Sequence, residues 1–194
     1  MLAYFHRSCA DFDRRLRAVR PDQWTAPTPC SEWTVRALVN HVVRGNFNYA
    51  ALLHGGSAAD FVRLRDADAL GCDAVSAFAA SVRSAMAAFE SPGALDRVVD
   101  YPLGRIRGAQ ALAVRTADVV IHTWDLARAV GGDEVLDAEL VGWIGDNLDA
   151  IYAGLPETPG SVETTHRFFA EPRGMSLSGA QGRLLHRMGR EASG

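Results

Sequence analysis

The sequence has few of the features that mark disulfide-rich or membrane proteins. Its three cysteines, Cys9, Cys30 and Cys72, lie far apart and form no CxxC pair, so neither a zinc ribbon nor a disulfide framework is predicted. No stretch of about 18 residues is apolar and free of charge, which excludes a membrane-spanning helix. The amino terminus has no apolar segment typical of a signal peptide. We therefore expect reduced thiols, a cytoplasmic location and no membrane partner.

An excess of positive charge is also missing. Asp and Glu number 23 against 20 Lys and Arg, the formal net charge is -3, and no long basic run occurs. Nucleic acid is therefore not an expected partner. With 194 residues, of which 48% are hydrophobic and 22% charged, the chain has the profile of a soluble globular protein that buries a sizeable core.

Several common catalytic motifs are absent as well. There is no GxSxG sequence, which gives no support to a serine nucleophile, and no GxGxxG sequence after a strand, which argues against dinucleotide binding. Four histidines lack an HExxH-like context and are expected at the surface or at helix ends: His6, His54, His166 and His186.

The hydrophobic spacing predicts an all-α protein. Apolar residues recur every three or four positions in helices expected over 2–19, 32–53, 69–90, 110–130 and 137–153, with a short terminal helix over 179–190. Ser31 is the expected N-cap of the second helix. Strand signals are confined to the segment from Leu95 to Arg107. We predict an up-and-down four-helix bundle over 1–154, with one long crossover across 91–109, and a C-terminal extension over 155–194 packed on the bundle.

Two of these helices carry candidate metal ligands. Asp118 and His122 are four residues apart in the helix Gln110–Val130, so their side chains share one face. The second helix carries His41, followed one turn later by Gly45, which leaves space beside the imidazole ring. Two histidines and a carboxylate from facing helices can hold a divalent metal in a bundle core. Zinc is the first expectation, with nickel, iron or manganese as alternatives.

Each of these residues also has a purely structural interpretation. His41 suits a hydrogen-bonded core histidine, with Gly45 permitting close helix packing. Asp118 suits an ion pair with Arg115. Asp125 suits a cap or a salt bridge, or else the outer acceptor that orients a ligating imidazole.

Three arginines could hold an anionic substrate or thiol, or could simply be solvated: Arg105, Arg107 and Arg115.

Three protein ligands would leave a coordination position for water or substrate, whereas a structural zinc usually has four protein ligands. A metal held in this way can acidify a bound water or thiol, or polarise a carbonyl. The pattern thus indicates a catalytic or binding site.

Segments spread over most of the chain resemble one known family. They are WTAPTPCSEWTVRALVNHVV, PLGRIRGAQALAVRTADVVIHTWDLARAVG and GRLLHRMGR. Together they resemble the DinB-like metal-binding superfamily, in the branch around the N-terminal domain of mycothiol-dependent maleylpyruvate isomerase.

The resemblance implies a DinB-type four-helix bundle with a divalent metal, typically zinc, bound by His41, Asp118 and His122. It also implies that a low-molecular-weight thiol such as mycothiol binds the metal as thiolate and reacts with an electrophilic substrate. The expected function is a metal-dependent thiol S-transferase or isomerase, and the alternative is a non-catalytic metal- or ligand-binding module. Bundles of this kind often pair through an exposed helix face, so a homodimer is a further expectation.

Overall fold

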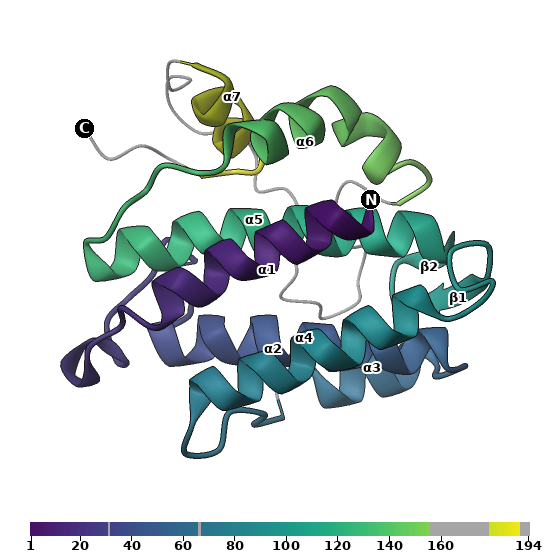
Figure 1. The fold of residues 1–194 in the computed structure, drawn as a ribbon, viewed down its shortest axis with the longest axis horizontal. Coiled ribbons are helices and arrows are strands. Elements are labelled where there is room, and N and C mark those ends of the chain that lie inside the picture. The colour runs from purple at the N-terminus through teal and green to yellow at the C-terminus, as the bar shows by residue number, and fades with distance from the viewer. Residues whose placement is uncertain (31, 66, 156–178, 191–194) are drawn as a thin grey trace. The chain divides into compact units, whose positions relative to one another are not determined.

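A computed structural model describes residues 1–30, 32–65, 67–155 and 179–190. The described residues are mostly helical (Figure 1), which confirms the predicted all-α class. In chain order the elements are α1 (Leu2–Leu16), the 3-10 turn η1 (Pro21–Gln23), α2 (Val35–Leu53), α3 (Ala58–Leu64), α4 (Ala74–Glu90), the strands β1 (Val98–Tyr101) and β2 (Gly104–Arg107), α5 (Gly108–Val130), α6 (Ala138–Ile151) and α7 (Gly179–Arg187). They divide between two compact units, Met1–Val135 and Leu136–Gly194.

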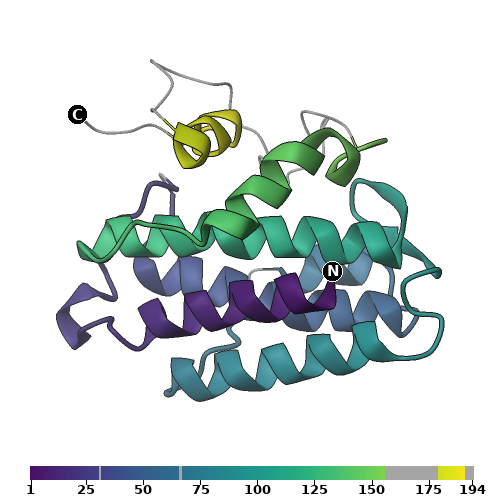
Figure 2. The same cartoon turned by 45° about the horizontal axis from the view of Figure 1, so that its top comes forward.

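The first unit is a bundle of the four long helices α1, α2, α4 and α5, in which α1 and α2 each pack against both α4 and α5 (Figure 2). Phe5 and Phe12 of α1 contact Phe89 and Phe78 of α4, so these two helices are antiparallel. α2 and α5 are also antiparallel, because His41 meets Asp118 whereas Asn46 meets Arg115.

The long crossover does not lie where the sequence predicted it. Arg97, which follows α4, donates a hydrogen bond to the carbonyl of Leu53 at the end of α2, so α2 and α4 run in the same direction. The chain must therefore return along the bundle between them, and its described residues 54–65 and 67–73, which include α3, do so. The segment 91–107 instead forms the antiparallel β1–β2 hairpin that leads into α5. The prediction placed the crossover wrongly because chain direction is a tertiary property.

The start of α2 also differs from the prediction. The N-cap is Thr34, whose hydroxyl accepts the N–H of Ala37 at 3.3 Å, whereas Ser31 lies outside the described residues. Before this cap, Pro27 and Thr34 form an antiparallel bridge. At the same end of the bundle, α5 ends at its C-cap Gly131 with φ +65°, a left-handed conformation that favours glycine.

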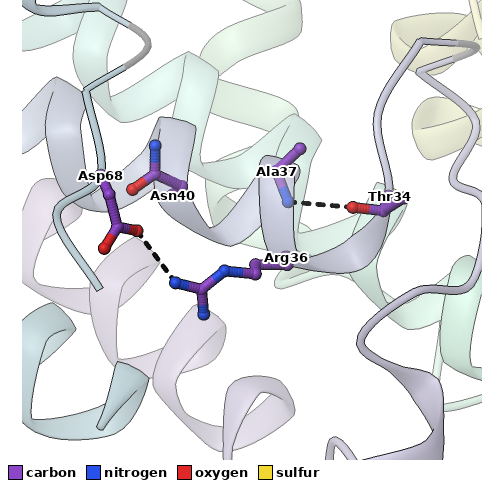
Figure 3. A pocket seen from close by; sticks show the side chains of 5 residues that line it. All are labelled: Thr34, Arg36, Ala37, Asn40 and Asp68. Carbon is purple, nitrogen blue, oxygen red and sulfur yellow. Dashed lines mark hydrogen bonds and ion pairs between the residues drawn. The ribbon is translucent and has the colours of Figure 1, made fainter. Parts of the chain in front are cut away.

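Polar contacts attach the crossover to one face of α2 (Figure 3). Arg36 pairs with Asp68 at 3.0 Å. Asn40 donates to the carbonyl of Ala67 at 3.2 Å and accepts the N–H of Ala69 at 2.8 Å. A hollow of about 240 Å³ between them is lined by Thr34, Arg36, Ala37, Asn40 and Asp68. These contacts occupy the outer face of α2, while His41 meets α5.

The second unit contains α6 and α7, which pack against each other. The N–H of Leu136 bonds to Gln181 at 2.9 Å, and Arg187 pairs with Asp149 at 2.6 Å. The sequence placed the boundary at residue 154, whereas α6 belongs to this second unit. Residues 156–178 and 191–194 of the predicted extension lie outside the described residues. No helix in the described part of the chain is long and apolar enough to cross a bilayer.

Candidate metal centre

The bundle brings the three predicted ligands together. Oδ1 of Asp118 lies 3.5 Å from Nε2 of His41 and 3.3 Å from Nε2 of His122. The three candidate ligand atoms all lie within 4.8 Å of one another. Around a tetrahedral zinc ion with bonds of about 2.0–2.1 Å, neighbouring ligand atoms are separated by roughly 3.3 Å. The spacing of these side chains therefore suits a divalent cation of this size.

The charges of the three groups are strongly coupled. Burial lowers the pKa of His41. Burial also opposes the charging of His122, but Asp118 and Asp125 outweigh it and raise the pKa of His122 well above its usual value. For Asp118, burial is outweighed by the two histidines and Arg115, which hold its pKa well below the usual range. In the metal-free protein a protonated His122 thus balances an ionised Asp118.

Asp125 supports the far side of the His122 ring. Its Oδ2 lies 2.9 Å from Nδ1 of His122, and the carboxylate is completely buried. When Nδ1 donates to this carboxylate, Nε2 is left to face Asp118, which is how the outer partners of ligating histidines usually act. Of the interpretations that the sequence left open, this contact favours the outer acceptor.

Two residues of the centre were missed by the sequence interpretation. Sγ of Cys30 lies 3.4 Å from Oδ2 of Asp125 and 4.0 Å from Nδ1 of His122. The centre of the Trp33 ring lies 4.7 Å from the centre of the His41 ring and 5.7 Å from the centre of the His122 ring. Both residues come from the irregular segment before α2, where no periodic spacing points to the centre. Both residues lie in the segment WTAPTPCSEWTVRALVNHVV, and its resemblance to the family was the feature that could have identified them.

The ligands are not sealed from solvent. The side chains of His41 and Asp118 are 11% and 16% exposed, and Trp33 beside them is half-buried. The bundle therefore does not enclose the centre completely.

Arg115 is buried inside the bundle. Only 1% of its side chain is exposed, and its guanidinium donates to Asp118, to Asn46 at 2.8 Å and to the carbonyl of Val42. The ion pair that the sequence suggested for Asp118 is therefore present, and these donors are directed at the protein itself. The guanidinium also fills the space opposite Gly45, where a Cβ would lie 2.5 Å from Nη1. The guanidinium of Arg115 therefore occupies this space, which the sequence analysis had assigned to the ring of His41.

The other two predicted arginines lie away from the centre. Arg105 is in β2 and Arg107 precedes α5, and both are exposed. Arg107 precedes Asp118 by eleven residues, or roughly 16 Å along a helix, so the structure does not bring these arginines to the ligands. Among the remaining histidines, His6 and His54 are exposed and His186 lies in the last turn of α7, while His166 lies outside the described residues.

The fold and the site define a helical bundle of the DinB-like class. Residues 5–127 match the family described as mycothiol maleylpyruvate isomerase N-terminal domain. This match covers more than half of the chain, so the protein belongs to that family, as the resemblance in its sequence predicted.

Individual relatives agree with this assignment. The chain is 38% identical over 136 residues, or 70% of each sequence, to uncharacterized proteins from two strains of Mycobacterium tuberculosis, CDC 1551 / Oshkosh and ATCC 25618 / H37Rv. Its fold is similar to crystal structures of mycothiol-dependent maleylpyruvate isomerase (TM-score 0.57, 18% identity) and of a single-site mutant of that enzyme (TM-score 0.59, 15% identity). These alignments cover 74% of this chain and 66% of the isomerase, so the chain spans just under two thirds of that enzyme.

Proposed function

We propose that this protein binds a divalent cation, zinc in the first instance, through His41, Asp118 and His122. The observation that carries the proposal is the convergence of three ligand atoms from two antiparallel helices, all within 4.8 Å of one another, with Oδ1 of Asp118 at 3.3 and 3.5 Å from the two imidazole nitrogens. The buried hydrogen bond that Nδ1 of His122 donates to Asp125 supports it. Nickel, iron and manganese remain chemically suitable alternatives.

We further propose that a low-molecular-weight thiol of the mycothiol type binds at the remaining coordination position as thiolate. The charges around the centre favour an anion there: a divalent cation and Arg115 together exceed the two carboxylates, Asp118 and Asp125, by one positive charge. The family supports the choice of thiol, because it is described as the N-terminal domain of mycothiol maleylpyruvate isomerase. The exposed edges of His41 and Asp118 give such a ligand access.

The reaction proposed is thiol addition to an electrophilic small molecule, as in an S-transferase or an isomerase. A bound divalent cation would lower the pKa of the thiol and so supply a nucleophile near neutral pH. The residues of this chain would hold that cation, with Asp125 fixing the His122 ring and Trp33 forming an apolar wall beside both imidazoles.

Metal analysis of protein purified without a histidine tag tests the first step. We expect about one equivalent of zinc per chain. It should be lost in His41→Ala, Asp118→Asn and His122→Ala. The matched control is His54→Ala, which removes an exposed histidine at the end of α2 and should retain the metal. Wild-type protein that takes up no zinc, nickel, iron or manganese would refute the site.

Addition of thiol to the cobalt-loaded protein tests the second step. A thiolate bound to Co²⁺ produces a new near-ultraviolet absorption, and mycothiol-dependent turnover of an electrophile should accompany it. If the metal binds and neither signal appears, the protein is a non-catalytic metal-binding module and the thiol part of the proposal is wrong. Loss of both signals in Asp118→Asn would tie the activity to this centre.

A further inference from the structure

The two oxygens of Asp118 face different partners. Oδ1 is the atom directed at Nε2 of both His41 and His122. Oδ2 is held instead by Nη1 of Arg115, three residues earlier on α5. A charge-assisted hydrogen bond of this kind is roughly twice as strong as a neutral one, so it orients the carboxylate as well as neutralising it.

Arg115 is itself fixed from other helices of the bundle. Its Nε donates to Oδ1 of Asn46 at 2.8 Å, and its Nη2 donates to the carbonyl of Val42, both on α2. Asn46 in turn donates to the hydroxyl of Ser81 on α4 at 2.9 Å. The side chains of Arg115, Asn46 and Ser81 are at most 1% exposed, so water does not compete for these contacts.

The packing around the guanidinium also leaves it little freedom. Gly45 lies directly against it, where a Cβ would approach Nη1 to 2.5 Å and Cζ to 2.8 Å. The guanidinium carbon lies 5.9 Å from the centre of the Tyr49 ring. The guanidinium of Arg115 is therefore held in one position, and it holds Oδ2 of Asp118 in place.

We infer that Arg115 is a positioning residue that makes Asp118 bind the cation through Oδ1 alone. A carboxylate freed from such a partner can turn and bind a cation through both oxygens, and the second oxygen then takes a coordination position. By holding Oδ2, Arg115 keeps that position available for the thiol. This inference rests on the proposed metal site and adds to it a reason why the fourth position stays accessible.

The test is the visible spectrum and the affinity of the cobalt-loaded protein after Arg115→Lys. Lysine keeps the positive charge but carries its donors on one nitrogen, so it does not reproduce the planar guanidinium whose three nitrogens reach Asp118, Asn46 and Val42. Because Co²⁺ absorbs more weakly as its coordination number rises, we expect a loss of visible absorption intensity at full cobalt occupancy. We also expect about tenfold weaker cobalt binding, as is usual when an outer partner is removed. The thiolate band should need more thiol to form.

The matched control is Arg44→Lys. Arg44 is an α2 arginine that bonds to the crossover carbonyls of Ala67 and Asp68, and its replacement should leave the cobalt spectrum unchanged. Asn46→Ala provides a milder second variant. It removes the acceptor of Nε, so it should lower the visible absorption and weaken cobalt binding in the same direction, by less than about tenfold.

The outcomes separate this inference from the proposed function. If wild-type protein binds no cobalt, the metal site itself is wrong. If wild-type protein binds cobalt but Arg115→Lys has the same spectrum and affinity, the positioning role alone is wrong. Should Arg115→Lys fail to fold, an unchanged spectrum in Asn46→Ala overturns the inference in its place, and a weakened one supports it.

Discussion

Nδ1 of His122 lies 2.9 Å from Oδ2 of Asp125, on the side of the ring opposite the nitrogen that faces Asp118. The imidazole of His122 thus lies between the carboxylates of Asp118 and Asp125, and all three residues belong to α5. Asp125 is completely buried and Cys30 is its second neighbour, at 3.4 Å. A buried carboxylate in this position fixes both the tautomer and the angle of the ring.

Replacement of Asp125 by Asn should weaken zinc binding without abolishing it. Asparagine keeps the shape of the side chain but removes the charge that favours donation from Nδ1 of His122. Losses of ten- to a hundredfold in metal affinity are typical for such outer partners, and we expect about tenfold here. Competition with a chromophoric chelator measures the change.

The control for that variant is Asp149→Asn, which neutralises a carboxylate that is 92% exposed. Its zinc affinity should equal that of the wild type. Equal affinity in Asp125→Asn as well would mean that the His122 ring is held by its packing alone, and the role proposed for Asp125 would be wrong.

Zinc binding should release a proton from His122. The pKa of this imidazole is raised well above its usual value in the metal-free protein, chiefly by Asp118 against the effect of burial. At pH 7 its Nε2 is therefore protonated, and it must lose that proton to bind a metal. Calorimetric titrations at pH 7 in buffers of different ionisation enthalpy should give about one proton released per zinc.

The direction of the pH effect follows from the same shift. Since the raised pKa keeps the proton on His122 through the neutral range, zinc affinity should rise with pH until the pH exceeds that pKa. Above it, proton release on binding should fall towards zero. Affinity that stays constant from pH 6 to pH 8, in a site otherwise shown to hold the metal, would contradict a protonated His122.

Cys9 should be inert to thiol reagents in the folded protein. Burial raises its pKa to about 12, so at pH 8 only about one molecule in ten thousand carries the reactive thiolate. Cys72 is exposed and should react at once, whereas Cys30 is half-buried and should react more slowly. Mass spectrometry after timed alkylation resolves the three. Rapid modification of Cys9 without denaturant would show that α1 opens readily from the bundle.

Local features of the centre could be predicted from the sequence, because helix geometry is local. Asp118 and His122 share a face through their spacing of four, and the same rule brings Arg115 to Asp118. His41 could be proposed because it lies in a helix with a clear apolar pattern. Its meeting with α5 required the helices to be antiparallel and in register, which only packing determines.

Features that depend on irregular backbone or on chain direction could not be predicted in the same way. Cys30 reaches Asp125 from a loop 95 residues earlier, and no periodicity records that contact. The position of the crossover depends on α2 and α4 being parallel. The space at Gly45 was recognised, but its occupant was not, because Arg115 comes from another helix.

Gly45 therefore offers a test of how tightly the centre is packed. Alanine in a helix interior normally stabilises a protein by up to about 1 kcal/mol relative to glycine. At Gly45 the new methyl group would lie 2.5 Å from Nη1 of Arg115, and the guanidinium is held by three partners. Overpacking of this kind costs about 1–3 kcal/mol, which exceeds the gain in helix propensity, so we expect Gly45→Ala to lower the free energy of unfolding by about 1 kcal/mol.

Gly142→Ala is the matched comparison, because a Cβ at Gly142 on α6 meets no atom within 4 Å. Urea denaturation should show this variant to be as stable as the wild type or slightly more stable, since only the helix propensity changes. If Gly45→Ala were stabilised to the same extent, the guanidinium of Arg115 would have moved aside without cost. That result would also weaken the case that Arg115 holds Asp118 in one orientation, because a guanidinium that a methyl group displaces without cost cannot fix the carboxylate.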